Sequence, residues 1–211
     1  DVTLAHYAEW LDGVVMHGGA DVWPGNYGEE PLREEWLGDR VRDLYDLAVV
    51  EAFSQAGKPI FGVCFGAQQI VKQLGGAVHA APAKEVGWAP VTRQSTAIPG
   101  VPAEVTVLHW HEEMFDLPPQ AQLLFSSAHL RNQGFLLGDN VIGLQFHLEP
   151  LPNNVREMVV NDGDYATGSV LDQTPQQILD YPESVETESL TFRLLDYITK
   201  HQSATGNGQL S

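Results

Sequence analysis

The chain of 211 residues carries 28 acidic and 11 basic residues, which gives a formal net charge of −17 at pH 7. This charge would repel a phosphate backbone, and no cluster of lysine or arginine offers a local exception. Hydrophobic residues make up 43% of the chain, as in ordinary globular proteins. No apolar run approaches the roughly 20 residues that span a bilayer. We therefore expect neither nucleic acid nor membrane among its partners.

The length and the terminal segments set the expected organisation. A domain usually holds roughly 100–200 residues, so we expect a single domain over residues 1–200. Residues 201–211 are polar and rich in small side chains, which predicts a disordered tail. The single cysteine excludes an internal disulfide, and the first residues have neither a basic nor an apolar signal region. The expected location is the cytoplasm.

Hydrophobic spacing in the first half predicts alternating helices and strands. Residues 2–10 suit a short helix, and residues 13–17 suit a buried strand that ends at a glycine pair. Apolar residues recur at helical spacing over residues 41–52, which predicts a second helix. The run "PIFGVC" then predicts a strand buried on both faces, and "AQQIVKQLGG" predicts the next helix, with Gly75 just after its last turn.

The second half contains short strand-like runs separated by Pro, Gly and Asn turns. These runs are "GWAPVTR", "AEVTVLHW", "QLLFSSA", "QGFLLG" and "NVIGLQFHL". After them, Thr174 followed by Pro175 and Gln177 predicts a helix start, and leucine spacing predicts a closing helix over residues 190–198. Strand-helix alternation followed by antiparallel-looking strands predicts an α/β fold with a mixed sheet.

Cys64 occupies the junction between a predicted strand and a predicted helix, in the sequence "GVCFG". This is the context of a nucleophile elbow, in which a tight turn lifts a side chain above the sheet edge and glycines permit close backbone approach. The thiolate is the nucleophilic form of cysteine, and a helix N-terminus or a neighbouring imidazolium stabilises it. A small buried hydrophobic residue is the other interpretation of a lone cysteine, and the local sequence leaves both open.

Two further segments carry candidate groups for the same chemistry. In "GLQFHLEP", His147 and Glu149 are two residues apart, so on a strand they share a face, as a base and its orienting group would. In "HGGAD", a strand ends at Gly18 and Gly19, whose backbone N–H groups suit half of an oxyanion hole. The N–H of Phe65 suits the other half. Each feature by itself is more often structural than catalytic.

In this order, "HGGAD", "GVCFGAQ" and "GLQFHLE" resemble the three motifs of the class I glutamine amidotransferases. The resemblance covers residues 11–150 and implies a three-layer α/β fold with a mixed, mainly parallel central sheet of the flavodoxin type. The sheet of that family begins with a strand and a helix ahead of the Gly-Gly strand. The resemblance therefore implies that the first strand is missing from this sequence.

The resemblance also assigns roles to individual residues. It implies that Cys64 is the nucleophile, that His147 is the base and acid, and that Glu149 is the third triad member. Gly19 and Phe65 would stabilise the oxyanion. The implied substrate contacts are Gly18, Gln68, Trp110 and His111.

The two halves of the sequence resemble different branches of that family. "LDGVVMHGGADVWPGNYGEEP" resembles the branch that includes gamma-glutamyl-GABA hydrolases, and "VLHWHEEMFDLPPQAQLLFSSAHLRNQGF" resembles proteins akin to the glutaminase domain of GMP synthase. The second branch usually has His-Gly-Asp where this chain has His111, Glu112 and Glu113. It also usually has proline where this chain has Leu148.

The implied reaction is hydrolysis of the glutamine side-chain amide through a glutamyl thioester, with ammonia passed to a separate synthase subunit. It requires no cofactor or metal. Hydrolysis of a gamma-glutamyl amine or peptide by the same triad is the closest alternative, because only the leaving-group pocket differs.

Two other functions stay open at the level of sequence. One is a non-catalytic module that retains the elbow as architecture and binds a metabolite or a partner. A metal site is a further alternative, because His109 and His111 of "HWHEE" share a strand face. Carboxylates follow these histidines, but the sequence alone does not place a third strong ligand beside them, so we predict no metal site.

Overall fold

The computed structural model of the chain describes residues 3–19, 40–182 and 184–200. In chain order its elements are α1 (Leu4–Trp10), β1 (Val14–Met16), α2 (Arg40–Gln55), β2 (Ile60–Val63), α3 (Phe65–Gln73), β3 (Val78–Arg93), β4 (Glu104–Phe115), β5 (Gln122–Ser126), β6 (Gly134–Leu137), β7 (Val141–Leu144), α4 (Pro152–Asp162), the 3-10 helix η3 (Gly163–Ala166), α5 (Pro175–Leu179) and α6 (Val185–Lys200). No helix in these ranges has both the length and the apolar character that a membrane span requires. The tail predicted over residues 201–211 lies outside the described residues.

The strands of the described residues form one seven-stranded sheet in the order β1-β2-β7-β6-β5-β3-β4. Strands β1, β2 and β7 pair in parallel, whereas the remaining neighbours pair antiparallel. The predicted α/β class with a mixed sheet is confirmed. The expectation that the sheet is mainly parallel is not met among the described strands. From β3 to β7 the strands follow one another without an intervening helix, and short connections of this kind give antiparallel pairs.

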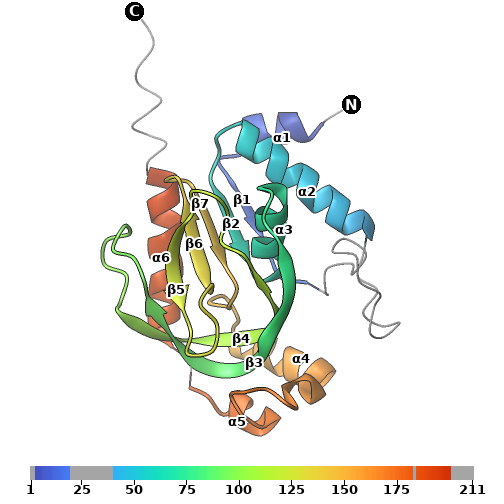
Figure 1. Cartoon of the computed structure of the whole chain (residues 1–211), viewed down its shortest axis with the longest axis vertical. Coiled ribbons are helices and arrows are strands. Elements are labelled where there is room, and N and C mark those ends of the chain that lie inside the picture. Colours follow the sequence, from blue (N-terminus) through green and yellow to red (C-terminus); the bar gives the residue numbers. More distant parts are fainter. Residues whose placement is uncertain (1–2, 20–39, 183, 201–211) are drawn as a thin grey trace, which may run out of the picture.

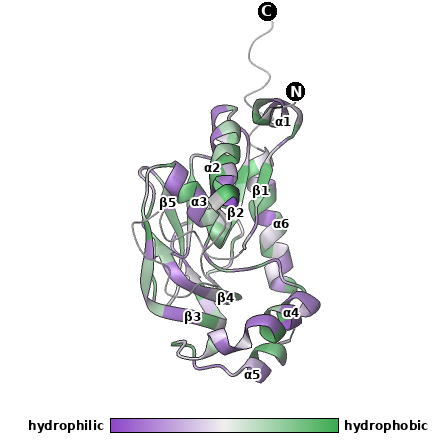
Figure 2. Ribbon diagram, turned by 90° about the vertical axis from the view of Figure 1, so that its right-hand side faces the viewer, coloured by the Kyte–Doolittle hydropathy of each residue, from purple (hydrophilic) through white to green (hydrophobic). Residues whose placement is uncertain are grey.

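Helices cover both faces of this sheet. Figure 1 shows α2 and α3 beside β1 and β2, with α6 on the other flank of the sheet. Ile60 packs in a core cluster with Ile70 of α3, while its neighbour Phe61 packs in a second cluster with Leu194 of α6. Figure 2 shows from the side that β1 and β2 lie between the helices α2 and α3 and the helix α6. Since successive strand residues point to opposite faces, β2 must be apolar at every position, as the sequence predicts.

Most of the predicted elements are confirmed at their predicted places. Gly75 follows α3 with a φ of 79°, and the Thr174 side chain accepts a hydrogen bond from the Gln177 backbone N–H at the start of α5. Helix α4 is not predicted by the sequence. Its buried residues are Val155 and Val159, which form too narrow an apolar stripe for periodicity to reveal.

Candidate active site

Cys64 forms the sharp turn between β2 and α3. Its φ of 52° and ψ of −114° put a non-glycine residue in a region that L side chains rarely occupy, which is the strained conformation of a nucleophile elbow. A Cβ atom at Gly62 would lie 2.9 Å from the backbone nitrogen of Ala67, and one at Gly66 would overlap the carbonyl of Met16. Both glycines are therefore required for the close approach of β1, β2 and α3.

His147 and Glu149 lie beyond β7, in an irregular segment outside the sheet's regular strands. The prediction places them on a strand, but β7 ends at Leu144, opposite the first residue of its partner β6. His147 instead forms an isolated antiparallel bridge with Leu108 of β4. The side chains still meet, because His147 Nδ1 lies 2.6 Å from Glu149 Oε1. The backbone N–H of Leu148 donates to the other carboxylate oxygen at 3.0 Å.

The two triad candidates on this segment shift each other's ionisation. Burial lowers the pKa of His147, but its hydrogen bonds to Cys64 and Glu149 outweigh burial and raise that pKa to about 10. Burial raises the pKa of Glu149, but the hydrogen bond and charge of His147 dominate, so the carboxyl pKa falls below its ordinary value. Near neutral pH the geometry therefore supports an imidazolium between a sulfur and a carboxylate.

The Gly-Gly segment lies against this pair. A Cβ atom at Gly18 would be 3.3 Å from His147 Cε1 and 3.8 Å from Cys64 Cβ, so the loop, the sulfur-bearing residue and the imidazole meet at one point. Phe65 is the first residue of α3, where a backbone N–H has no acceptor within the helix. The structure thus brings the predicted nucleophile, base and glycine loop together.

Two residues that the sequence analysis did not single out also approach the elbow. Gln145 Nε2 lies 3.9 Å from Cys64 Sγ, and Gln145 Oε1 accepts a hydrogen bond of 3.4 Å from Gln68. The buried Gln68 is therefore linked to the sulfur through Gln145. The position of Gln145 inside "GLQFHLE" is a signal that could have found it.

Arg42 of α2 is the second of these residues. Its guanidinium donates to the carbonyl oxygen of Gly18 at 3.3 Å and lies 5.0 Å from the centroid of the Phe65 ring. A Cβ atom at Gly19 would overlap this guanidinium. The contact joins the loop to the elbow across a long stretch of chain, so no local sequence pattern reveals it.

Trp110 and His111, the remaining predicted substrate contacts, lie on opposite faces of β4. The ring centroid of Trp110 lies 6.2 Å from that of Tyr165, and Trp110 packs against the core cluster that includes Val155 of α4. His111 is 2% exposed and faces Glu85 and His109. Because successive side chains on a strand diverge, the two side chains cannot line one pocket together. Their roles as substrate contacts stay predictions. Only the β4 backbone at Trp110 and His111 could contact one substrate at both positions.

Glu85, His109 and His111 form a buried polar cluster between β3 and β4. Glu85 is the cross-strand partner of His111. Burial lowers the pKa of His109 to about 3, with repulsion from His147 adding to that shift, and burial lowers the pKa of His111 well below its ordinary value. Burial also raises the pKa of Glu85. Both imidazoles are therefore neutral in this cluster.

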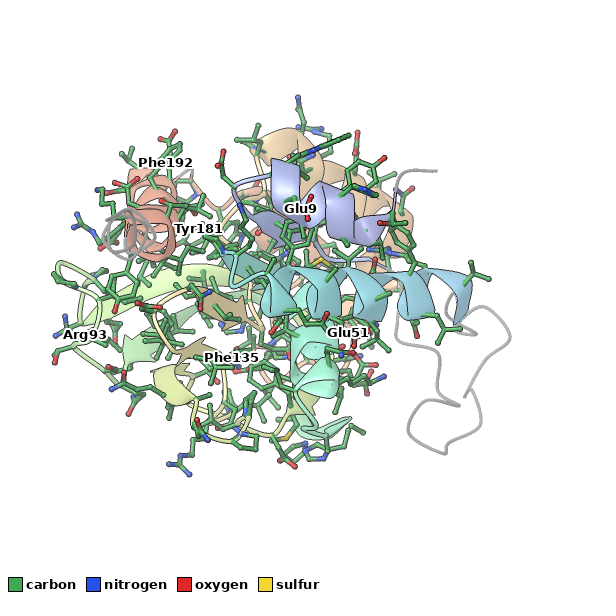
Figure 3. All side chains as sticks on the ribbon, turned by 90° about the horizontal axis from the view of Figure 1, so that it is seen from above. Glu9, Glu51, Arg93, Phe135, Tyr181 and Phe192 are labelled. Carbon is green, nitrogen blue, oxygen red and sulfur yellow. The ribbon has the colours of Figure 1, made fainter. Side chains whose placement is uncertain are left out.

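A cavity of about 390 Å³ opens beside His147 and Glu149. Its walls come from α4, α5, α6 and β3, and they include the side chains of Trp88, Tyr181 and Phe192. Trp88 and Tyr181 stack with ring centroids 4.5 Å apart. Figure 3 labels Tyr181 and Phe192, which come from the segment before α6 and from α6 itself. The cavity is mostly apolar, with the Glu149 carboxylate at its edge.

Comparisons with known proteins place the chain among glutamine amidotransferase-like proteins. The chain is 41% identical over 76 residues to the glutamine amidotransferase-like protein YvdE of Lactococcus lactis, covering 36% of this chain and 32% of that protein. It is 37% identical over 98 residues to a GMP synthase of Thermomicrobium roseum, covering 45% of this chain and 18% of that protein. The matched regions therefore span well under half the length of these curated relatives.

A solved structure extends the likeness to most of the fold. The crystal structure of a glutamine amidotransferase from Thermotoga maritima matches with a TM-score of 0.73 at 26% identity, over 91% of this chain and 80% of that chain. The model of the family Peptidase C26 matches residues 1–109, which hold the Gly-Gly loop and the Cys64 elbow. The chain therefore belongs to the Peptidase C26 family of class I glutamine amidotransferase-like proteins.

Proposed function

We propose that the chain hydrolyses the side-chain amide of glutamine with Cys64, His147 and Glu149 as a catalytic triad. The observation that carries this proposal is the position of the imidazole between its two partners. His147 Nδ1 is 2.6 Å from the Glu149 carboxylate, and a hydrogen bond to Cys64 contributes to the raised pKa of the imidazole. This is the order of contacts that an orienting acid, a general base and a nucleophile require.

In the first half of the reaction, the Cys64 sulfur attacks the amide carbon of the glutamine side chain. The carbonyl π bond opens, and its oxygen becomes an oxyanion that accepts hydrogen bonds from the backbone N–H groups of Gly19 and Phe65. One such donor typically contributes about 3–4 kcal/mol to transition-state stabilisation. His147 then gives its proton to the leaving nitrogen as the carbon–nitrogen bond breaks. Ammonia leaves and a glutamyl thioester remains on Cys64.

In the second half, water attacks the thioester carbon. His147, now neutral, takes a proton from this water, while the carbon–sulfur bond breaks and the Cys64 thiolate returns. Glutamate leaves, and the imidazolium is restored beside Glu149. Every proton passes through His147, so this cycle needs no cofactor.

The fate of the ammonia is the second part of the proposal. Two relatives named glutamine-hydrolysing GMP synthases match this chain over 59% and 45% of its length, but over only 27% and 18% of their own. We infer that the chain supplies this ammonia to a synthase subunit. Glutamine binding would then involve Gly18, Gln68 and the β4 backbone at Trp110 and His111.

A second candidate, hydrolysis of gamma-glutamyl amines, is favoured by the cavity beside His147 and Glu149. A cavity of about 390 Å³ exceeds the need of ammonia as a leaving group and suits a larger, mainly apolar amine. The same triad serves both reactions, because only the group bonded to the scissile nitrogen differs. The half-exposed Glu149 carboxylate would favour a protonated amine product.

The deciding experiment measures ammonia, amine and glutamate release from glutamine and from a panel of gamma-glutamyl alkyl- and arylamines, with Cys64→Ala as the control. Glutamine turnover that disappears in Cys64→Ala supports the glutaminase, and a preference for the bulky amines supports the second candidate. An electrophilic glutamine analogue tests Cys64 independently of turnover. Folded protein that neither turns over these substrates nor reacts with the analogue would indicate the non-catalytic module.

A further inference from the structure

The buried cluster between β3 and β4 takes no part in the proposed mechanism, yet it brings three metal-ligand groups together. Glu85 Oε2 lies 3.7 Å from His109 Nδ1 and 3.5 Å from His111 Nε2. The two nitrogens are 3.3 Å apart. We propose that Glu85, His109 and His111 bind a divalent cation of the zinc class.

The spacing of these atoms fits a shared metal better than a set of hydrogen bonds. Hydrogen bonds between such groups are usually about 2.7–3.2 Å long, so all three separations are too long to be good ones. With metal–nitrogen and metal–oxygen bonds of about 2.0–2.1 Å, a tetrahedral centre holds its ligand atoms about 3.3–3.4 Å apart. The cluster forms one face of such a tetrahedron, which leaves the fourth position for water or another oxygen ligand.

The hydrogen bonding of His111 points its lone pair at the same centre. His111 Nδ1 lies 3.2 Å from the backbone carbonyl oxygen of Glu113, which only accepts hydrogen bonds. The ring proton is therefore on Nδ1, and Nε2 presents its lone pair to the Glu85 carboxylate. Two facing acceptors repel unless a proton or a metal cation lies between them, and a separation of 3.5 Å is too long for a well-shared proton. A ligand histidine is usually fixed in this way by a backbone carbonyl on its other nitrogen.

The surroundings of Glu85 supply the rest of a metal shell. Gln133 Nε2 donates to Glu85 Oε2 at 2.5 Å, as the hydrogen-bonded neighbours of a ligating carboxylate do. Glu85 Oε1 and Gln133 Oε1 are buried and have no hydrogen-bond partner. Glu85 and Gln133 are both 0% exposed, so these oxygens cannot reach water without rearrangement. A cation at the Glu85 carboxylate would offset the cost of burying a charge whose second oxygen has no donor.

Backbone geometry delivers Glu85 to this position. The register of β3 against β4 shifts between Ala80 and Glu85, after which Glu85 pairs with His111. A bulge of this kind commonly re-aims a side chain. The third ligand therefore comes from a strand distant in sequence from "HWHEE", which explains why the two histidines alone do not predict it.

The experiment measures binding of cobalt(II) and zinc(II) to Cys64→Ser protein, because the Cys64 thiolate would otherwise compete for the metal. Metal content after dialysis gives the stoichiometry, and the intensity of the visible cobalt absorption distinguishes four-coordinate from six-coordinate sites. We expect one tightly bound ion per chain with a four-coordinate spectrum. Zinc should raise the melting temperature of this protein, and a chelator should reverse the rise.

Two variants in the same background locate the ion. Glu85→Gln keeps the shape and hydrogen bonding of the side chain but removes its charge, and we expect binding to weaken by about 100-fold or more. Glu112→Gln makes the same change at an exposed position of β4 and should leave binding unchanged. If Glu85→Gln does not fold, His109→Gln replaces it.

The proposal is overturned if folded Cys64→Ser protein fails to bind either ion stoichiometrically, since a proton shared within the cluster would then suffice. It is also overturned if Glu85→Gln binds as tightly as its parent. A loss of binding in Glu112→Gln that matches the loss in Glu85→Gln would place the ion elsewhere and would equally reject this site.

Discussion

The described part of the chain contains two buried histidine–carboxylate clusters, and the pKa values of their histidines shift in opposite directions. The pKa of His147 is raised to about 10, whereas that of His109 is lowered to about 3. Both imidazoles are almost fully removed from water, so burial alone cannot account for the difference. The contacts decide the direction of each pKa shift. His147 Nδ1 lies 2.6 Å from Glu149 Oε1, whereas His109 Nδ1 lies 3.7 Å from Glu85 Oε2.

The exposure of the carboxylate accounts for the rest of the contrast. The Glu149 side chain is 48% exposed and stays ionised at the rim of the cavity, whereas the Glu85 side chain is 0% exposed. A carboxylate in contact with water can stabilise an imidazolium, and a fully buried one is itself driven toward its neutral form. One arrangement therefore suits proton transfer, and the other suits neutral imidazole ligands. The same residue types therefore give different chemistry according to how deeply the carboxylate is buried.

The largest expected effect removes the imidazole of the first cluster. His147→Asn should lower kcat for the active substrate by about 10³–10⁴-fold, because the leaving nitrogen loses its acid and the thiol loses its base. His79→Asn is the matched control, since His79 faces Asp116 at 3.7 Å but both side chains are about half exposed. Steady-state kinetics on both variants tests the prediction. A His147→Asn rate within tenfold of the parent would contradict the triad.

Removing only the carboxylate should have a smaller effect. Glu149→Gln should lower kcat by about 10²-fold, and it should lower the pKa of His147, because an amide cannot balance the charge of an imidazolium. The pKa is measured from the pH dependence of the histidine ring signals by NMR. An unchanged His147 pKa would mean that Cys64 alone raises it, and Glu149 would then be no part of the triad.

The strain at the elbow gives a third test, on stability. With a φ of 52°, Cys64 occupies backbone space that glycine enters freely. Cys64→Gly should therefore be more stable than Cys64→Ala by about 1 kcal/mol, although both should be inactive. Urea denaturation of the two variants measures the difference. Equal stabilities would mean that the turn is relaxed and that the side chain of Cys64 is presented without strain.

The first cluster was predictable from sequence and the second was not, for a physical reason. Cys64 and the pair His147–Glu149 lie in short local patterns, a glycine-flanked junction and a two-residue spacing, and local patterns are visible in a chain. The contact of Glu85 with His111 depends on a register shift in β3. Register is fixed by the pairing of whole strands, so a single segment does not reveal it.

The fold shows the same division. The parallel unit of β1, β2 and α3 follows from apolar runs and glycine positions, and it is confirmed. The prediction that most strand pairs are parallel was wrong for the described strands, because the direction of each pair depends on how later strands return to the sheet. Arg42 of α2 likewise reaches the loop residue Gly18, a contact that only the assembled structure contains.

The smallest expected effect is the pH dependence of the His147–Glu149 pair. The folded pKa of His147 is about 10 against an ordinary value of 6.5, so its contribution to stability is complete below pH 6.5 and is lost as the pH rises toward 10. The pKa of Glu149 is lowered from 4.5, so its contribution is complete above pH 4.5 and is lost as the pH falls through the folded value.

The free energy of unfolding of the parent should therefore exceed that of Glu149→Gln most between pH 4.5 and 6.5. We expect a difference of about 1 kcal/mol, because solvent screens a half-exposed carboxylate. Urea denaturation of both proteins across the pH range measures it. The difference should shrink toward pH 10 as the imidazolium loses its proton. A difference that persists unchanged there would mean that a neutral hydrogen bond holds the pair, and the contrast with the Glu85 cluster would lose its electrostatic basis.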